Sequence, residues 1–226
     1  MIFWLDGYPD RLDHADPGGL VGFGGEIEPR TVLDAYRVGA FPWSSDPVAT
    51  WWSPDPRPVF EIATYRPHRR LRRRIAHAGW RFTLDRDFGA VMRACAEPTP
   101  EREETWITPD FIAAYGALHR DGHAHSVEVW EGEALVGGIY GLAIGGYFCG
   151  ESMFHRRPDA SKAALAHLVE RLRAGGFVLF DAQYPSGHLI RIGATLLRRP
   201  AFLARLRAAL AVEARLAPDP APALGR

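Results

Sequence analysis

The sequence contains only two cysteines, Cys95 and Cys149, among its 226 residues. They form no C-x-x-C pair and stand beside no set of metal ligands, which argues against a cysteine-bound metal and favours reduced thiols. No stretch approaches the roughly 20 apolar residues that a membrane-spanning helix needs. The first apolar run ends at Asp6 without a preceding basic segment, unlike a signal peptide. We therefore expect a cytoplasmic protein with no membrane association.

The short motifs that bind nucleotide phosphates are also absent. Neither G-x-x-x-x-G-K-[S/T] nor G-x-G-x-x-G occurs, and the G-x-S-x-G motif of serine hydrolases is missing. Lys and Arg together number 27, as do Asp and Glu, so the net charge is zero. Proteins that coat nucleic acids are usually basic overall, so a nucleic-acid surface would have to be a local patch.

Apolar residues make up 47% of the chain, which is typical of a globular protein with a buried core. Pro29 near a first turn and Gly39 after a last turn predict a helix over 28–36. The Thr108-Pro109 pair predicts the start of a second helix. All the helices expected from such patterns lie at 28–36, 66–78, 87–96, 108–121 and 160–173.

Alternating and continuous apolar runs predict strands at 80–84, 126–130, 135–144, 147–154 and 177–181. The short turns between the middle three predict an antiparallel meander. The helix at 160–173 is long enough to cross between parallel strands. We therefore expect an α+β fold, with a small N-terminal domain at 1–62, a larger domain at 63–216 and a disordered tail at 217–226.

An unusually basic segment falls within the second expected helix. Its arginines are interleaved with no acidic residue, and they are Arg66, Arg69, Arg70, Arg72, Arg73 and Arg74. A run of like charges repels itself unless an anion meets it, so a phosphate backbone is one interpretation. A solvated surface helix is the other.

Tryptophans are frequent in the turn-rich parts of the chain, where they include Trp43, Trp51, Trp52 and Trp106. Core packing is the commoner use of tryptophan. An aromatic platform on which an unpaired nucleotide stacks is the alternative.

Two carboxylates stand in or beside apolar strand patterns. Glu151 lies inside the run 147–154, where a buried carboxylate is unfavourable unless it is paired or used. Asp181 and Gln183 follow the last expected strand, and ligands often collect at the carboxyl ends of strands in α/β sheets. These three residues are therefore candidates for a site.

Three histidines raise the question of a metal. His123 and His125 stand two residues apart, and His188 lies far downstream. They lack the remaining ligands of a zinc site, so the interpretation as structural histidines is favoured and we expect no metal.

Read in order, the motifs resemble leucyl/phenylalanyl-tRNA–protein transferases over about residues 18–207. The matching segments are GGEI at 24–27, YRVGAFPW at 36–43, WWSPDPR at 51–57, TWIT at 105–108, GHAHSVEVW at 122–130, LVGGIYG at 135–141, GESMF at 150–154, ASK at 160–162 and DAQ at 181–183. Any one of them could arise by chance, but the ordered set is specific.

The resemblance implies a small N-terminal domain on an acetyltransferase-like (GNAT-like) C-terminal domain. It implies transfer of Leu or Phe, and less well Met, from aminoacyl-tRNA to proteins that begin with Arg or Lys. The modified proteins are then degraded under the N-end rule. The charged tRNA is itself the donor, so no cofactor is expected, and we expect a monomer.

The resemblance also assigns residues to roles. Trp43 and Trp106 match positions that hold the 3′-terminal adenosine, and Glu151, Asp181 and Gln183 match the polar centre. The apolar pocket for the transferred side chain falls at or near Ile139, Phe148, Met153, Leu168 and Leu172. The tRNA backbone is expected at the basic cluster Arg66, Arg69, Arg70, Arg73 and Arg74.

The sequence departs from the family pattern near its last motif. Ala182 stands where the family often has Cys, and Arg191-Ile192-Gly193 replaces the usual Ser-Leu-Gly. The loop 184–187 also differs. These departures bear on the acceptor preference.

An aminoacyl ester is already activated, and an α-amino group with a pKa near 7.7–8.0 is partly neutral at pH 7. We therefore expect the protein chiefly to align amine and ester. Asp181 is expected to orient or deprotonate the amine, with Gln183 fixing that carboxylate or the ester. Glu151 would pair with the cationic acceptor side chain or anchor the tRNA terminus. Two rival functions are an acyl-CoA-dependent acyltransferase and a non-catalytic tRNA- or degron-binding module.

Overall fold

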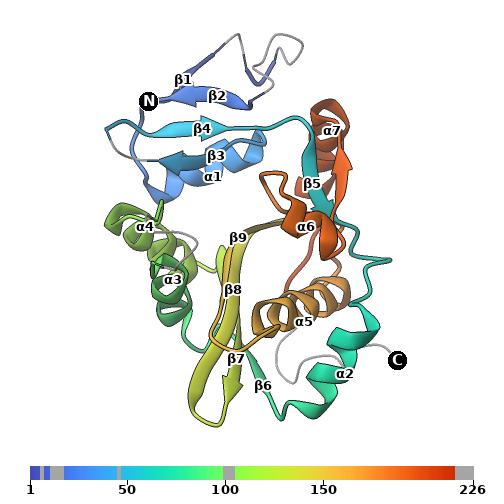
Figure 1. Cartoon of the computed structure of the whole chain (residues 1–226). Coiled ribbons are helices and arrows are strands. Elements are labelled where there is room, and N and C mark those ends of the chain that lie inside the picture. Colours follow the sequence, from blue (N-terminus) through green and yellow to red (C-terminus); the bar gives the residue numbers. More distant parts are fainter. Residues whose placement is uncertain (6–7, 11–17, 45–46, 99–104, 217–226) are drawn as a thin grey trace.

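The computed structural model describes residues 1–5, 8–10, 18–44, 47–98 and 105–216. The expected disordered tail at 217–226 lies outside these residues. Within the described part of the chain, strands form two sheets and helices pack around them (Figure 1). The expectation of a mixed α and β architecture is confirmed.

The smaller sheet has four strands in the order β1-β2-β4-β3. They are β1 (Phe3–Trp4), β2 (Leu20–Phe23), β3 (Phe41–Ser44) and β4 (Thr50–Trp52). Helix α1 (Pro29–Arg37) has Pro29 in its first turn, and Gly39 follows it with φ at 82°, as predicted. The sheet itself was not predicted, because strands of two to four residues are too short to display an alternation.

The larger sheet has seven strands in the order β11-β5-β10-β9-β8-β7-β6. They are β5 (Arg57–Phe60), β6 (Arg81–Leu84), β7 (Ala124–Glu131), β8 (Ala134–Ile144), β9 (Tyr147–His155), β10 (Leu179–Asp181) and β11 (Thr195–Leu197). Strands β7, β8 and β9 form the predicted antiparallel meander. Strand β10 runs parallel to β9, so the predicted crossover is confirmed. Strand β5 lies inside the expected 1–62 range but pairs with this sheet.

In the described part of the chain, six helices accompany the larger sheet: α2 (Arg69–His77), α3 (Phe88–Ala96), α4 (Pro109–Arg120), α5 (Ala160–Ala174), α6 (Gly187–Arg191) and α7 (Arg199–Leu210). Helices α3 and α4 cover one face of the meander and α5 covers the other (Figure 1). Helix α2 packs beside α5. Among the described residues, no helix combines the length and the apolar character that crossing a bilayer requires.

The basic helix begins later than predicted. Helix α2 starts at Arg69, not Arg66, and the His68 ring caps it by accepting a hydrogen bond from the Arg70 amide at 3.2 Å. The physical reason is Pro67, which disfavours helical backbone at the residue before it.

Buried arginines connect the small sheet to β5 and α7. Arg57 from β5 donates Nη1–H to the Gly39 carbonyl at 3.1 Å, just beyond α1. Its guanidinium also lies 4.7 Å from the Phe41 ring of the small sheet and 4.5 Å from the Phe202 ring of α7. Arg199 donates Nε–H to the Ser53 carbonyl at 2.6 Å. The edge of the small sheet is therefore held in a fixed position against the larger one.

Candidate active site

A cavity of about 210 Å³ opens where the two sheets meet. Four of the residues expected to form a site line it, namely Trp43, Trp106, Glu151 and Gln183. They come from β3, the segment before α4, strand β9 and the loop after β10. The remaining lining residues are Phe41, Pro42, Ala182 and Tyr184. Residues from widely separated parts of the chain thus converge on one small hollow.

Glu151 reaches this hollow because it is the extra residue of a β-bulge. Along β8 and β9, Tyr140 pairs with Ser152, but the next residue, Gly141, pairs with Gly150. Glu151 therefore has no partner in the ladder. Bulges turn a side chain out of the alternation of a strand and are frequent beside active sites.

The Glu151 carboxylate is almost fully buried and receives three hydrogen bonds. Tyr36 donates its hydroxyl to Oε1 at 2.7 Å, Tyr115 donates to Oε2 at 3.3 Å, and Gln183 donates Nε2–H to Oε2 at 2.9 Å. Burial raises the pKa of Glu151 to about 7, although these hydrogen bonds act in the opposite direction. A carboxyl group with that pKa can exchange a proton with an amine at neutral pH.

Gln183 is held by its backbone as well as its side chain. Its φ is 64°, a left-handed conformation that is uncommon for residues with a side chain. Its amide N–H donates to Asp181 Oδ1 at 2.8 Å, and its Nε2–H also lies 3.2 Å from the Tyr36 hydroxyl. The strained turn directs the Gln183 side chain at Glu151.

Asp181 occupies a different place from the one expected for a residue that meets the amine. It is fully buried and does not line the cavity. Arg57 donates Nε–H and Nη2–H to its two oxygens at 2.8 and 2.7 Å, and Tyr147 donates its hydroxyl to Oδ2 at 2.7 Å. With both oxygens engaged in this way, the geometry does not support direct contact between Asp181 and a substrate amine.

Sequence reasoning gave no role to Arg57, Tyr36 or Tyr115, which complete this network. All three are fully buried. Arg57 and Tyr36 stand within the segments 51–57 and 36–43 that carried the family resemblance. The charge of Arg57 inside such a segment was a sequence signal that could have pointed to a role in the site. Their contacts join residues 124 and 115 positions apart, which no local pattern displays.

Both candidate tryptophans are half-buried. Trp43 contacts Tyr184 edge to face, with ring centroids 4.7 Å apart, and packs against Trp52 at 5.5 Å. Trp106 packs edge to face against Phe111 at 5.2 Å. By contrast, Trp51 is fully buried, and its Nε1–H donates to the Gly24 carbonyl at 2.8 Å. The core interpretation therefore holds for Trp51, whereas Trp43 and Trp106 line the cavity.

The residues expected to form the apolar pocket gather in one core cluster between the larger sheet and α5. Four of them are buried there: Ile139, Phe148, Leu168 and Leu172. Met153, two residues beyond Glu151 on β9, is only partly buried and packs against them. None of the five lines the cavity of 210 Å³.

The structure divides the basic cluster into two groups. Arg66, Arg70 and Arg74 line a cleft of about 670 Å³ bounded by α2, the start of α5 and α6. The exposed side chains of Arg69 and Arg73 do not line it. The cluster is therefore not one uniform surface.

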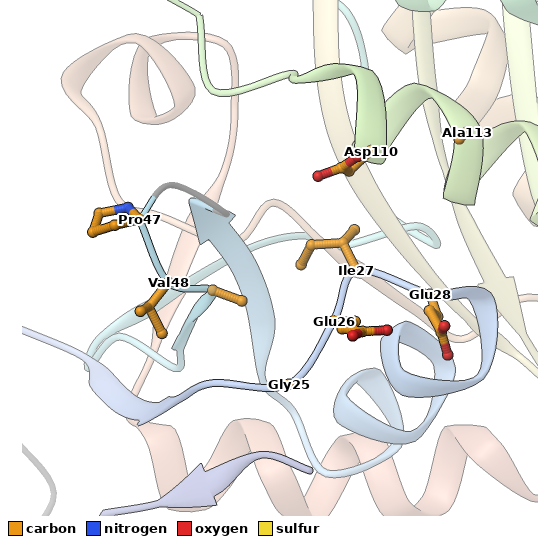
Figure 2. Close-up of a pocket in the computed structure, with 9 residues that line it drawn as sticks. Gly25, Glu26, Ile27, Glu28, Pro47, Val48, Asp110 and Ala113 are labelled. Carbon is orange, nitrogen blue, oxygen red and sulfur yellow. The ribbon is translucent and has the colours of Figure 1, made fainter.

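A separate cavity of about 550 Å³ lies between the loop before α1 and the start of α4 (Figure 2). Glu26, Glu28 and Asp110 line it together with Ile27 and Val48. It shares no lining residue with the cavity at Glu151.

The candidate histidines do not gather at one place. His125 lies 2.7 Å from Asp85 through Nδ1, while His188 lines the cleft beside α2. Within the part of the chain that the structure describes, no group of three or more His, Cys, Asp or Glu side chains is placed to hold a metal ion.

The family models and the sequence relatives agree on one family. The model of the leucyl/phenylalanyl-tRNA protein transferase matches residues 59–207, and the model of that enzyme's N-terminal domain matches residues 25–55. A leucyl/phenylalanyl-tRNA–protein transferase of Shewanella denitrificans is 52% identical over 84% of this chain and 82% of its own length. The enzyme of that name from Shewanella piezotolerans is 49% identical over 88% of this chain and 85% of its own length.

Among solved structures, the chain is similar to L-PGS from Bacillus licheniformis with a TM-score of 0.43 and 15% identity. That match covers 71% of this chain and 54% of the other. The family models and the close relatives carry the assignment. The chain belongs to the leucyl/phenylalanyl-tRNA–protein transferase family.

Proposed function

We propose that the cavity at Glu151 is the centre where an aminoacyl group passes from tRNA to the N-terminus of a protein. The donors are Leu-tRNA and Phe-tRNA, and less well Met-tRNA, and the acceptors begin with Arg or Lys, which marks them for degradation under the N-end rule. The observation that carries this proposal is the convergence of Trp43, Trp106, Glu151 and Gln183 on one hollow of about 210 Å³.

The two tryptophans hold the donor's terminal adenosine. Both rings are partly accessible and line the same cavity, which suits them to stack on a base. Stacking of one base on an aromatic ring contributes about 1–3 kcal/mol. The 3′ end would thereby bring its ester beside Glu151.

Glu151 accepts the proton that the acceptor amine loses. The amine nitrogen forms a bond to the ester carbonyl carbon, and the bond from that carbon to the ribose oxygen breaks. The proton passes from the amine through Glu151 to the ribose oxygen, so charge and atoms balance. A carboxyl pKa near 7 is suited to both transfers at neutral pH, because it lies close to the pKa of an α-amino group.

Asp181 acts through Gln183 and not on the substrate. Its carboxylate, fixed by Arg57, accepts the Gln183 amide hydrogen bond that stabilises the left-handed turn. Gln183 in turn orients the Glu151 carboxylate. Asp181 and Arg57 are therefore positioning residues.

The transferred side chain enters the apolar cluster beside Met153. This methionine is the least buried of the five candidate pocket residues and stands two positions from Glu151. A flexible thioether can move aside for a Leu or Phe side chain. Discrimination against side chains branched at Cβ by shape alone is worth about 1–3 kcal/mol, so some leakage is expected.

The division into two domains remains part of the proposal. A small N-terminal domain ends near residue 62, and an acetyltransferase-like (GNAT-like) domain extends to 216, with β5 paired into the larger sheet. The parallel β9 and β10 joined through α5, and the bulge in β9, support this plan.

The function is tested by the transfer of radiolabelled leucine from Leu-tRNA to peptides that begin with Arg, Lys or Ala. We expect labelling of the first two and none of the third. Labelling of none of the peptides, with tRNA still bound, would contradict the proposal and indicate a binding protein.

A further inference from the structure

Tyr184 lies in the transfer cavity, but the reaction described above does not use it. The residue lines the cavity together with Glu151 and is 40% exposed. It also belongs to the loop 184–187, where the sequence departs from the family pattern. A partly exposed aromatic ring in a reaction cavity is available to contact a substrate.

The chain on both sides holds Tyr184 in position. On one side, the Gln183 amide donates a hydrogen bond to Asp181 at 2.8 Å. On the other side, the ring of Pro185 disfavours helical backbone at Tyr184. Ser186 then caps α6 by accepting a hydrogen bond from a backbone amide of that helix at 3.2 Å. Because the position of Tyr184 is fixed in advance, a substrate that contacts it loses little conformational entropy.

The positive charge of the acceptor needs a partner other than Glu151. Tyr36, Tyr115 and Gln183 already donate hydrogen bonds to this carboxylate. A carboxylate offers about four acceptor sites, so roughly one is left, which suits the single proton of an attacking amine. A guanidinium presents a fork of several N–H donors and needs more than that. A cation paired with Glu151 would also lower the pKa of the carboxyl group and weaken it as a base.

Aromatic rings are the other groups in the cavity that can hold a cation. None of the described residues that line it is cationic, so a cationic side chain meets no like charge among them. The Phe41 ring is buried and already lies 4.7 Å from the Arg57 guanidinium. Trp43 and Trp106 hold the adenosine in the proposed function. Tyr184 is the remaining ring, and it is more exposed than the other three.

The length of the substrate's own side chain suits this position. Gln183 donates to Glu151 at 2.9 Å, and Tyr184 is the next residue along the chain, about 3.8 Å away between Cα atoms. Arg and Lys carry their charge at the end of long methylene stems. An acceptor whose α-amine lies at Glu151 can therefore extend its cation to the neighbouring Tyr184 ring.

We propose that Tyr184 selects the acceptor by binding the cationic side chain of its first residue, Arg or Lys, on the face of the phenol ring. This inference rests on the proposed function, because the amine of the same residue must lie at Glu151. A cation within about 6 Å of an aromatic centroid is attracted by the negative face of the ring. Tyr184 thus contributes to binding and specificity and takes no part in proton transfer.

The kinetics of leucine transfer to an Arg-start peptide at saturating Leu-tRNA test the proposal. Tyr184→Leu removes the ring and should raise the KM of the peptide about 3- to 10-fold. The kcat should change little, because the contact is the same before and during the reaction. Tyr184→Phe keeps the ring face and should keep the wild-type KM. An unchanged KM in Tyr184→Leu, or an equal rise in Tyr184→Phe, would overturn the proposal.

A citrulline-start peptide shows whether the ring recognises charge. Citrulline has nearly the shape of arginine but is neutral. Used as a competitor of the Arg-start peptide, it reports binding whether or not it accepts leucine. We expect it to inhibit the wild type and Tyr184→Leu equally, because it has no charge for the ring to attract. If Tyr184→Leu weakened both peptides by the same factor, the ring would act through shape, which would overturn the proposal.

Phe23→Leu is the matched control, because Phe23 is similarly exposed, at 44%, and does not line the cavity. It should leave the KM of the Arg-start peptide unchanged. A rise equal to that in Tyr184→Leu would overturn the proposal, since it would not depend on the cavity.

The KM of Leu-tRNA separates acceptor binding from donor binding. It should be the same in the wild type and in Tyr184→Leu. A rise in this KM alone would place Tyr184 against the adenosine and overturn the assignment. Transfer by the wild type with no effect of Tyr184→Leu would refute only the role of Tyr184. By contrast, no transfer to the Arg-start peptide by the wild type would refute the proposed function.

Discussion

Asp181 and Arg57 form a buried ion pair in which each side chain neutralises the charge of the other. Both side chains are essentially inaccessible, and two hydrogen bonds of 2.8 and 2.7 Å join them. A buried pair adds little net stability compared with apolar residues of similar size, but removing one partner leaves an uncompensated charge. The ion pair matters here because it fixes the position of Asp181, which also accepts a hydrogen bond from the Gln183 amide.

This reasoning predicts that stability and transfer can be separated at the ion pair. Arg57→Met should destabilise the protein by about 3–5 kcal/mol, because Asp181 is left buried and unpaired. The double variant Arg57→Met, Asp181→Leu should recover most of that stability yet remain slow in transfer, since the Gln183 amide loses its acceptor. Urea unfolding and single-turnover transfer measure the two effects. Recovery of the transfer rate in the double variant would show that the pair is only structural.

At the scale of single elements, the bulge between β8 and β9 decides where Glu151 points. The close approach of the two strands at this place depends on Gly141. A Cβ atom there would lie 2.1 Å from the Cys149 carbonyl oxygen and 2.6 Å from the Phe148 ring. Backbone atoms cannot withdraw as the end of a flexible side chain can, so the bulge requires glycine at this position.

Gly141→Ala should therefore separate β8 from β9 at the bulge. We expect a loss of about 1–3 kcal/mol in the free energy of unfolding, as for other overpacked sites, together with slower transfer. Gly116→Ala in α4 is the matched control, since its new Cβ would meet only the Arg120 side chain at 3.8 Å. The control should be neutral or slightly stabilising. Equal stabilities of the two variants would contradict the importance of the bulge.

At the scale of the whole molecule, long elements were predictable and the assembled site was only partly so. The meander and α5 were predicted because they are long, with 11 residues in β8 and 15 in α5. The strands of the small sheet, with two to four residues each, are too short to give such a signal. Glu151 could be named as unusual within an apolar strand, but the register shift that turns it toward Tyr36 and Tyr115 is a property of the strand pair.

The same limit explains why we propose a different role for Asp181 from the one expected. Its position at the end of a strand suggested contact with the substrate, yet its burial depends on Arg57, 124 residues away in the chain. Likewise, the run of arginines indicated an anion site. That Arg70 and Arg74 line the cleft while Arg69 does not depends on α6 lying opposite α2, which the sequence does not show. The residue types of the site were thus predictable from the sequence, whereas their contact partners could be identified only from the tertiary structure.

The central claim, that Glu151 moves the proton during transfer, is tested most directly by the pH dependence of single-turnover leucine transfer to an Arg-start peptide. Protonation of the α-amine, whose pKa is near 7.7–8.0, lowers the rate of every variant as the pH falls. The wild-type rate should fall more steeply below about pH 7, because Glu151 must also be ionised to accept a proton. Glu151→Gln should lose this ionisation and react about 100- to 10,000-fold more slowly. Glu128→Gln removes another buried carboxyl group, whose pKa is also raised by burial, and should keep the wild-type profile. A Glu151→Gln enzyme with the rate and pH profile of the wild type would contradict the account.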